Sequence, residues 1–355
     1  MAERALFRQK LLLFVLFRIQ GDRTLRSAYH LLTGKKTAQT IQDGKLYQTL
    51  FLFQSLPAYS EREFNQDVHD LAFQQKYIVL SKDSGTLTSK GKEKVNELIS
   101  HPPWSNHYNG WLYEKAASIL WQRLSLFVQA LSFGLKKDSF YIPVTNNHAV
   151  LTWVKEEWKR KPDKEASAET LFQELHKLLC TLEKLDSDIF VSRLSGWKAP
   201  GLTFGQCAST FDIESSEARF RFNGVLHYLI KEGSARPESY PFLYSFIKDI
   251  GNSQGLTATA LKTKELLLQK KSKEEISVIR GLRPSTIEDH IVEISSYDPS
   301  FLIDTYVSEQ LQKQIVQASL RRQTKKLKII KEEVGAGVTY FQIRLALAQG
   351  ERHGT

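Results

Sequence analysis

The chain has 355 residues, enough for two or three domains, and its 41% hydrophobic and 25% charged composition is that of an ordinary soluble globular protein. Its 49 basic and 39 acidic side chains give a formal charge of +10, which makes an anionic partner a reasonable expectation. The two cysteines, Cys180 and Cys207, form no CxxC motif, which indicates a reducing compartment and argues against a structural zinc site.

Two apolar segments superficially resemble targeting or membrane segments. The run over residues 11–17 is short, and Arg18 closes it without the small-residue cleavage site of a signal peptide. Residues 116–135 contain polar and charged side chains that a membrane-spanning helix of about 20 residues excludes. We therefore expect a cytoplasmic protein that does not enter a membrane.

Residues 1–100 are predicted to form one domain that begins with helices. Apolar spacing predicts a helix near the N-terminus and another over residues 45–56. Ser60 and Glu63 match a capping box that opens a helix at about Glu61. The segments YIVLS and TLTSK flank a turn over residues 82–85 and predict a hairpin, after which a helix resumes. This order resembles a winged helix, and a generic α+β module fits it equally well.

Residues 101–250 are predicted to form a helical middle domain. Helices are expected over residues 111–133, 146–160 and 167–186. A second helix-turn-helix is suggested by Ala208, the apolar Ile213 and a helix from about Ser215 that carries Arg219 and Arg221. Asp212 stands where a glycine usually makes the turn, so an ordinary helical hairpin is the alternative. The prolines and glycines of residues 236–255 predict a linker.

Residues 252–350 carry the clearest motif in the stretch SKEEISVIRGLRPSTIEDHIVEIS. Ser272 with Glu275 and Ser285 with Glu288 each match a capping box, so two consecutive helices are predicted. Gly281 is expected to end the first helix because glycine adopts positive φ at low cost. A helix-turn-helix core is predicted from Leu282 at the turn and from the isoleucines at 276, 279, 287, 291 and 294.

The sequence after this motif distinguishes between families that share it. GLRPSTIEDHI resembles the reading unit of LuxR-type activators, but more than fifty residues follow it and include YFQIRLALA. The pairing of the two motifs resembles the helix-turn-helix domain at the tail of RecQ-type helicases and some RNase D proteins. The whole chain is similar to the YpbB-like proteins of Bacillus and relatives, in which this domain occurs without its own helicase motor. The resemblance implies a mainly α, multi-domain protein and a RecQ-type helicase as its partner.

No catalytic constellation stands out in the sequence. Walker A, HExxH and GxSxG motifs are absent from it. Cys180 lies four residues after His176, as a Cys–His dyad on a helix would, but the leucines around it favour a packed core thiol. We therefore expect a protein that is not an enzyme and that binds neither a cofactor nor a metal.

Three surfaces are candidates for nucleic-acid binding. The first is the start of the second helix of the motif, although Glu288, Asp289 and Glu293 on that helix would repel phosphate. The second is the basic run over residues 319–331, for which a solvated helix face is the alternative. The third is the predicted wing with Lys82 and the lysines of residues 90–94. The predicted contacts on the first two surfaces are Arg280, Arg283, Ser285, Thr286, Arg321, Arg322, Lys325, Lys326 and Lys328.

These observations favour a non-enzymatic accessory protein of DNA repair or recombination. It would bind DNA weakly or according to DNA structure, and it would act with a RecQ-type helicase. A sequence-specific transcriptional regulator is one alternative, and its weak point is the acidic reading helix. A protein-interaction scaffold that does not contact nucleic acid is the other.

Overall fold

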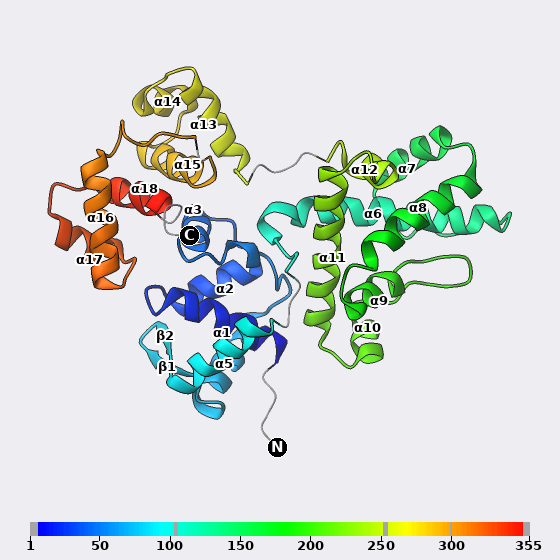
Figure 1. Cartoon of the computed structure of the whole chain (residues 1–355), viewed down its shortest axis with the longest axis horizontal. Coiled ribbons are helices and arrows are strands. Elements are labelled where there is room, and N and C mark those ends of the chain that lie inside the picture. The colour runs from blue at the N-terminus through cyan, green and yellow to red at the C-terminus, as the bar shows by residue number, and fades with distance from the viewer. Residues whose placement is uncertain (1–5, 103–105, 139, 251–254, 299, 351–355) are drawn as a thin grey trace. The chain divides into compact units, whose positions relative to one another are not determined.

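The computed structural model describes residues 6–102, 106–138, 140–250, 255–298 and 300–350, and its fold is mainly α, as predicted (Figure 1). The chain divides into two compact units. Unit 1 comprises Asn96–Asn252 together with the chain up to Leu11, and unit 2 comprises Leu12–Val95 and Ser253–Thr355. Residues 12–95 and the last segment of the chain therefore share unit 2, although residues 96–252 of unit 1 separate them in the sequence. The division into three domains at residues 100 and 252 stays a prediction.

The N-terminal segment forms helices followed by one hairpin. Ile78 pairs with Leu87 and Ser81 with Ser84 across two antiparallel strands, which confirms the predicted hairpin. The backbone carbonyl of Asp83 in its turn accepts a hydrogen bond of 2.8 Å from the amide at the start of the second helix. The elements are α1 (Phe7–Ile19), α2 (Leu25–Thr33), α3 (Ala38–Leu46), the 3₁₀ helix η1 (Leu50–Leu52), α4 (Glu61–His69), the π-helix η2 (Asp70–Gln74), β1 (Ile78–Ser81), β2 (Ser84–Leu87) and α5 (Ser89–Ser100).

The helix predicted over residues 45–56 is wrong. Helix α3 ends at Leu46, and Gln48 and Gln54 both adopt positive φ, so only the short η1 forms between them. The apolar residues of this stretch are buried in the core without belonging to one helix face. The capping box of Ser60 and Glu63, in contrast, is present and opens α4 at Glu61 as predicted.

Unit 1 is a helical bundle around α11, with a core rich in phenylalanine. Phe127, Phe190 and Phe246 are completely buried there. In the described residues of either unit, no helix combines the length and the apolar character that a membrane-spanning segment needs. The helices of unit 1 are α6 (Gly110–Leu135), α7 (His148–Arg160), α8 (Lys164–Leu179), α9 (Lys184–Ser192), α10 (Phe204–Phe211), α11 (Ser215–Ala235) and α12 (Pro241–Ile247).

Two predictions for this unit need correction. The helix predicted over residues 167–186 is two helices, because α8 ends at Leu179 and the hydroxyl of Ser187 in α9 donates to the carbonyl of Leu179. The predicted linker over residues 236–255 contains α12, whose buried aromatic residues join the core. The carboxylate of Glu174 accepts the two amides at the start of α12, at 2.9 and 2.8 Å. Residues 251–254 of that linker lie outside the described residues.

The described residues of the C-terminal segment of unit 2 form six helices. Its core contains Ile276, Ile287 and Ile291 of the predicted motif together with Ile343 and Leu345 of the distal YFQIRLALA. That second motif is therefore the core helix α18, which packs against α15 and α16. The helices are α13 (Ala258–Leu268), α14 (Lys273–Arg280), α15 (Pro284–Tyr297), α16 (Glu309–Arg322), α17 (Leu327–Val334) and α18 (Tyr340–Gly350).

Candidate nucleic-acid interface

Helices α14 and α15 form the predicted helix-turn-helix. The capping box of Ser272 and Glu275 opens α14, and Gly281 ends it in the left-handed region at φ +60°. The backbone amide of Leu282 then donates to the carbonyl of Ser277 at 3.1 Å, and the hydroxyl of Ser277 donates back to the Leu282 carbonyl at 2.6 Å. Ile276 and the isoleucines of α15 are fully buried below the turn. Local hydrogen bonds and core packing together fix the angle between the two helices.

Two details of this motif differ from the prediction. Helix α15 starts at Pro284 with Arg283 as its N-cap, and no side chain caps it. The predicted capping box of Ser285 and Glu288 is therefore wrong, because proline at the first helical position opens the helix earlier than that box requires. Glu288 instead forms an ion pair of 2.9 Å with Lys273 of α14. Ile279, which was expected to be buried, is exposed on α14.

The acidic residues of α15 have partners inside unit 2. Asp289 accepts a hydrogen bond of 3.1 Å from Gln42 of α3 and pairs with Arg344 of α18. Glu293 is buried and accepts the backbone amide of Thr257 and, at 3.0 Å, its hydroxyl. Burial raises the pKa of Glu293 above its ordinary value, and the hydrogen bonds from Thr257 offset part of this shift. These carboxylates are engaged by side chains and backbone of the protein itself.

Helix α3 of the N-terminal segment packs against α15. The ammonium group of Lys45 lies 3.6 Å from the centre of the Tyr297 ring and donates to the carbonyl of Ser296 at 3.5 Å. Leu46 packs against the core of the C-terminal segment, and Val292 of α15 is buried in that core. Part of the surface that α15 would present to a DNA groove is thus covered by the protein itself.

The predicted contacts at the start of α15 divide into two pairs. Arg280 points inward, since its guanidinium donates to the carbonyl of Thr259 at 2.7 Å and lies 3.3 Å from Nδ1 of His290. Burial lowers the pKa of His290, and the charge of Arg280 lowers it further. Thr286 is half-buried, whereas Arg283 and Ser285 are exposed. Only the exposed pair could reach a phosphate in this conformation.

A cavity of about 410 Å³ lies between α3, α13 and α15. Its carboxylates, Asp289 and Glu293, are already engaged by Gln42, Arg344 and Thr257. The remaining lining side chains mix hydroxyl, imidazole and ammonium groups, and they do not define one class of ligand. The lining residues are Lys36, Thr37, Ala38, Ile41, Gln42, Thr257, Ala258, Thr259, Thr286, Asp289, His290 and Glu293.

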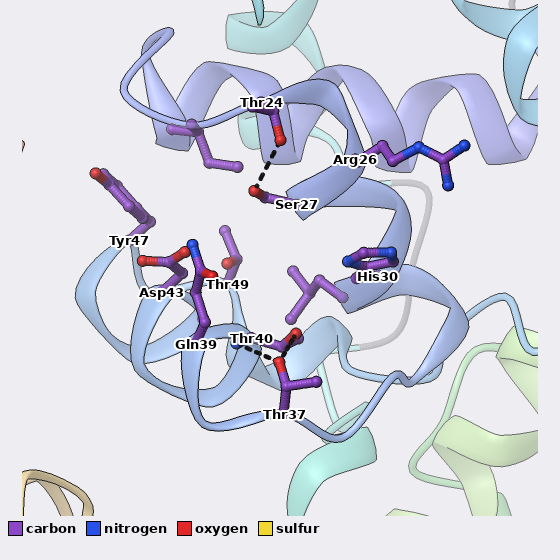
Figure 2. Close-up of a pocket in the computed structure, with 13 residues that line it drawn as sticks. Thr24, Arg26, Ser27, His30, Thr37, Gln39, Thr40, Asp43, Tyr47 and Thr49 are labelled. Carbon is purple, nitrogen blue, oxygen red and sulfur yellow. Dashed lines mark hydrogen bonds between the residues drawn. The ribbon is translucent and has the colours of Figure 1, made fainter. Parts of the chain in front are cut away.

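Figure 2 shows a smaller pocket between α2 and α3, with a volume of about 160 Å³. The carboxylate of Asp43 on its wall pairs with Arg23 at 2.8 Å, and a hydrogen bond joins the hydroxyls of Thr37 and Thr40 at 2.8 Å. Drug-sized ligands usually occupy pockets of roughly 300–1,000 Å³. This pocket is therefore too small to hold a nucleotide.

The basic run of residues 319–331 spans the end of α16, a turn and the start of α17. At the end of α16, Arg321 and Arg322 both bind the carboxylate of Glu333. The distance from Nη2 of Arg321 to Oε1 of Glu333 is 2.9 Å, and Nε of Arg322 donates to Oε2. The hydrogen bond from Arg322 is the largest cause that holds the pKa of Glu333 below its ordinary value. Lys328 lies 4.0 Å from Glu332 and is 82% exposed. Positive charge exceeds negative charge on this surface.

Asp22 of the N-terminal segment holds the turn between α16 and α17. Its carboxylate accepts the hydroxyl of Thr324 and the backbone amide of Lys325, both at 2.7 Å. The ammonium group of Lys325 donates to the carbonyl of Leu46, so this predicted contact is structural. Lys326 lies 4.0 Å from Asp22 and keeps 45% of its side chain exposed.

Sequence patterns do not identify Asp22, Gln42 or Glu333 as partners of the predicted residues. None of these polar residues belongs to a local motif. Asp22 and Gln42 lie far along the chain from the residues that they contact, whereas Glu333 lies on the next helix after Arg321 and Arg322. The acidic residues of α15 were the one indication of such contacts, because carboxylates on a helix that should face phosphate need partners within the protein.

On the predicted wing, Lys90 donates to the carbonyl of Gln75 at 3.0 Å. Cys180, predicted to be a core thiol, is exposed, with Sγ 3.5 Å from Nε2 of His176.

The comparisons with known proteins agree with this architecture. The family described as a helix-turn-helix domain matches residues 259–347. Protein YpbB of Bacillus subtilis (strain 168) is 35% identical over 337 residues, which cover 94% of this chain and 95% of YpbB. The chain belongs to the YpbB family. With its helix-turn-helix domain, this family member is a nucleic-acid-related helical protein. No solved structure matches it.

In the described part of this member of the YpbB family, the helix-turn-helix geometry occurs twice. Helices α10 and α14 each have eight residues, open with a capping box and end at a left-handed residue, Asp212 in α10 and Gly281 in α14. The second helix begins three residues after that position in both cases. In unit 1, however, Arg221 faces inward, since it is buried against Asp186 at 2.8 Å, and Arg219 is half-buried. The turn predicted there is confirmed, and it serves packing within the bundle.

Proposed function

We propose that this chain is a non-enzymatic accessory protein that binds nucleic acid weakly and acts with a RecQ-type helicase. The observation that carries the proposal is the exposed basic cluster at the turn between α16 and α17, formed by Arg321, Arg322, Lys326 and Lys328. Counterion release would give such a cluster affinity for phosphate without sequence preference. The helicase partnership is supported by the resemblance of the domain to the tail of RecQ-type helicases.

The covered face of α15 argues against the transcriptional regulator. Base reading by this helix would require α3 to move away from it, which would break the contacts of Gln42 with Asp289 and of Lys45 with Tyr297. Direct readout also needs side chains that reach base edges, and the acidic side chains of α15 are engaged within the protein. Structure-dependent binding through the basic cluster requires neither the movement of α3 nor the release of these acidic side chains.

The binding test uses the full chain with single-stranded, forked and duplex DNA over a series of salt concentrations. Neutralising the four cluster residues to glutamine should reduce the salt slope on single strands by up to about 3, at roughly 0.7 per contact. The matched control neutralises four exposed lysines of unit 1, and it should leave the slope unchanged. Those control lysines are Lys159, Lys177, Lys184 and Lys231.

If the chain binds none of the three DNA forms at low salt, the alternative of a protein-interaction scaffold without nucleic-acid contact is favoured. Equal slopes for the cluster variant and the unit 1 variant would show that the wrong surface was chosen. The partnership is tested separately, by co-precipitation of the purified chain with the RecQ-type helicase of the same organism, with and without forked DNA. Failure of association under both conditions would refute the partnership but not the binding.

A further inference from the structure

A set of exposed apolar side chains follows the end of α6 in unit 1. Phe140 is 88% exposed and Ile142 is 84% exposed, which are the highest values for large apolar side chains in the described part of the chain. Val144 is exposed next to them. Contiguous apolar side chains on a protein surface commonly mark an interaction site.

The backbone that carries these side chains is held in place by α6. The buried side chain of Gln129 donates to the carbonyl of Ile142 at 3.0 Å and accepts from the amide of Val144 at 3.0 Å. The ring of Tyr141 packs against Phe133, with ring centres 4.9 Å apart. The buried side-chain amide of Gln129 thus positions a segment whose apolar side chains face solvent.

The surroundings of this segment are positively charged. Lys136 and Lys137 precede it, and Lys198 lies on a neighbouring turn, with its ammonium group 4.3 Å from the centre of the Trp197 ring. The same ring lies 5.9 Å from the ammonium group of Lys136, so the two basic segments adjoin.

Asp138 is the one acidic residue between positions 116 and 155. Both of its carboxylate oxygens accept hydrogen bonds. Oδ1 accepts the amide of Phe140 at 3.0 Å, and Oδ2 accepts Nε1 of Trp197 at 3.1 Å. Asp138 therefore joins the two segments, and Lys136, Lys137 and Lys198 outnumber its single negative charge, which favours an anionic partner.

We propose that this surface docks an acidic segment of a partner protein that carries apolar side chains. The surface consists of Lys136, Lys137, Phe140, Ile142, Val144 and Lys198. Single-stranded nucleic acid is also anionic, but its bases bind by stacking on aromatic rings. Phe140 is the one ring among the three apolar side chains of this surface. Ile142 and Val144 offer no ring, and their burial calls for aliphatic or aromatic side chains of a peptide. The surface lies in unit 1, so it is independent of the basic cluster of unit 2.

The probe is a labelled peptide that alternates aspartate with phenylalanine and leucine, titrated with the full chain by fluorescence anisotropy. Two control peptides replace either the aspartates with lysine or the apolar residues with serine. The double variants Phe140→Ser with Ile142→Ser, and Lys136→Glu with Lys137→Glu, should each weaken binding about tenfold or more. All four positions are exposed, and circular dichroism checks that the variants remain folded.

Matched control variants change Leu268 and Val278 to serine, or Lys159 and Lys231 to glutamate, at exposed positions elsewhere. These controls should bind the acidic peptide as the unmodified chain does. The proposal is overturned if the acidic peptide does not bind, or if it binds the surface variants unchanged. It is also overturned if the variants weaken binding of a single-stranded oligonucleotide alone. Light scattering measures the molar mass of the chain and of the Phe140→Ser variant. If the substitution halves this mass, the surface joins two copies of the chain, and the proposal is likewise overturned.

Discussion

Replacing Asp289 with alanine tests whether α15 is held inside unit 2 or is free to contact nucleic acid. The substitution removes the hydrogen bond from Gln42 and the ion pair with Arg344. In this pair the side chain of Asp289 is 29% exposed and that of Arg344 is 20% exposed. Hydrogen bonds to a charged group contribute roughly 1.5–3 kcal/mol, and partial exposure screens the charge. Arg344 would also lose its carboxylate partner. We expect the free energy of unfolding to fall by about 2–3 kcal/mol.

Urea denaturation followed by two signals assigns this loss to a unit. All six tryptophans lie between residues 104 and 197, within the range of unit 1, so their fluorescence reports that unit, while far-ultraviolet circular dichroism reports both. Asp289→Ala should shift the circular dichroism transition and leave the tryptophan transition in place. The control Glu274→Ala removes a carboxylate that is 70% exposed and should change stability by less than about 0.5 kcal/mol. A similarly small change for Asp289→Ala, together with tighter DNA binding, would refute the covered position of α15.

Substitutions at three further positions test the fold. Gly281→Ala should cost about 1 kcal/mol in urea denaturation, because φ is +60° but no atom lies within 4 Å of an added Cβ. Glu174→Ala should cost about 3 kcal/mol by tryptophan fluorescence, since two buried amides lose their acceptor, and Glu174→Gln should cost less. Burial lowers the pKa of His227 to about 3, so the unfolded chain binds a proton first as pH falls below about 6.5. Unit 1 should therefore lose up to about 3 kcal/mol between pH 7 and pH 4, and His227→Gln should remove that part of the loss.

Local chemistry made much of the fold predictable from the sequence. The capping boxes of Ser60 and Ser272 identify helix starts because each hydroxyl bonds to an amide three residues away. Gly281 marks the turn because a left-handed backbone favours glycine, and the isoleucines of α15 mark a buried face by their spacing. Asp212 shows the limit of this reasoning, since an aspartate adopts the same conformation at the corresponding turn of unit 1.

The candidate interface was less predictable because it depends on contacts between distant parts of the chain. Nothing near Asp289 indicates that Gln42 covers it, and nothing near Lys325 indicates that Asp22 accepts its amide. An exposed lysine and a lysine bound to a distant carbonyl look the same in a sequence. Composition therefore located the basic run, whereas only the fold separates Lys325, which is structural, from the exposed Lys328.

The discontinuous chain path of unit 2 has a consequence for biosynthesis. During translation the N-terminal segment leaves the ribosome well before its partner helices, because all of residues 96–252 are made in between. At roughly 5–20 residues per second, this delay is on the order of ten seconds. Throughout that time the surface of α3 that later meets α15, with Gln42, Lys45 and Leu46, has no partner from its own chain. The nascent protein must keep this half-built unit from aggregating until its last hundred or so residues have been synthesised.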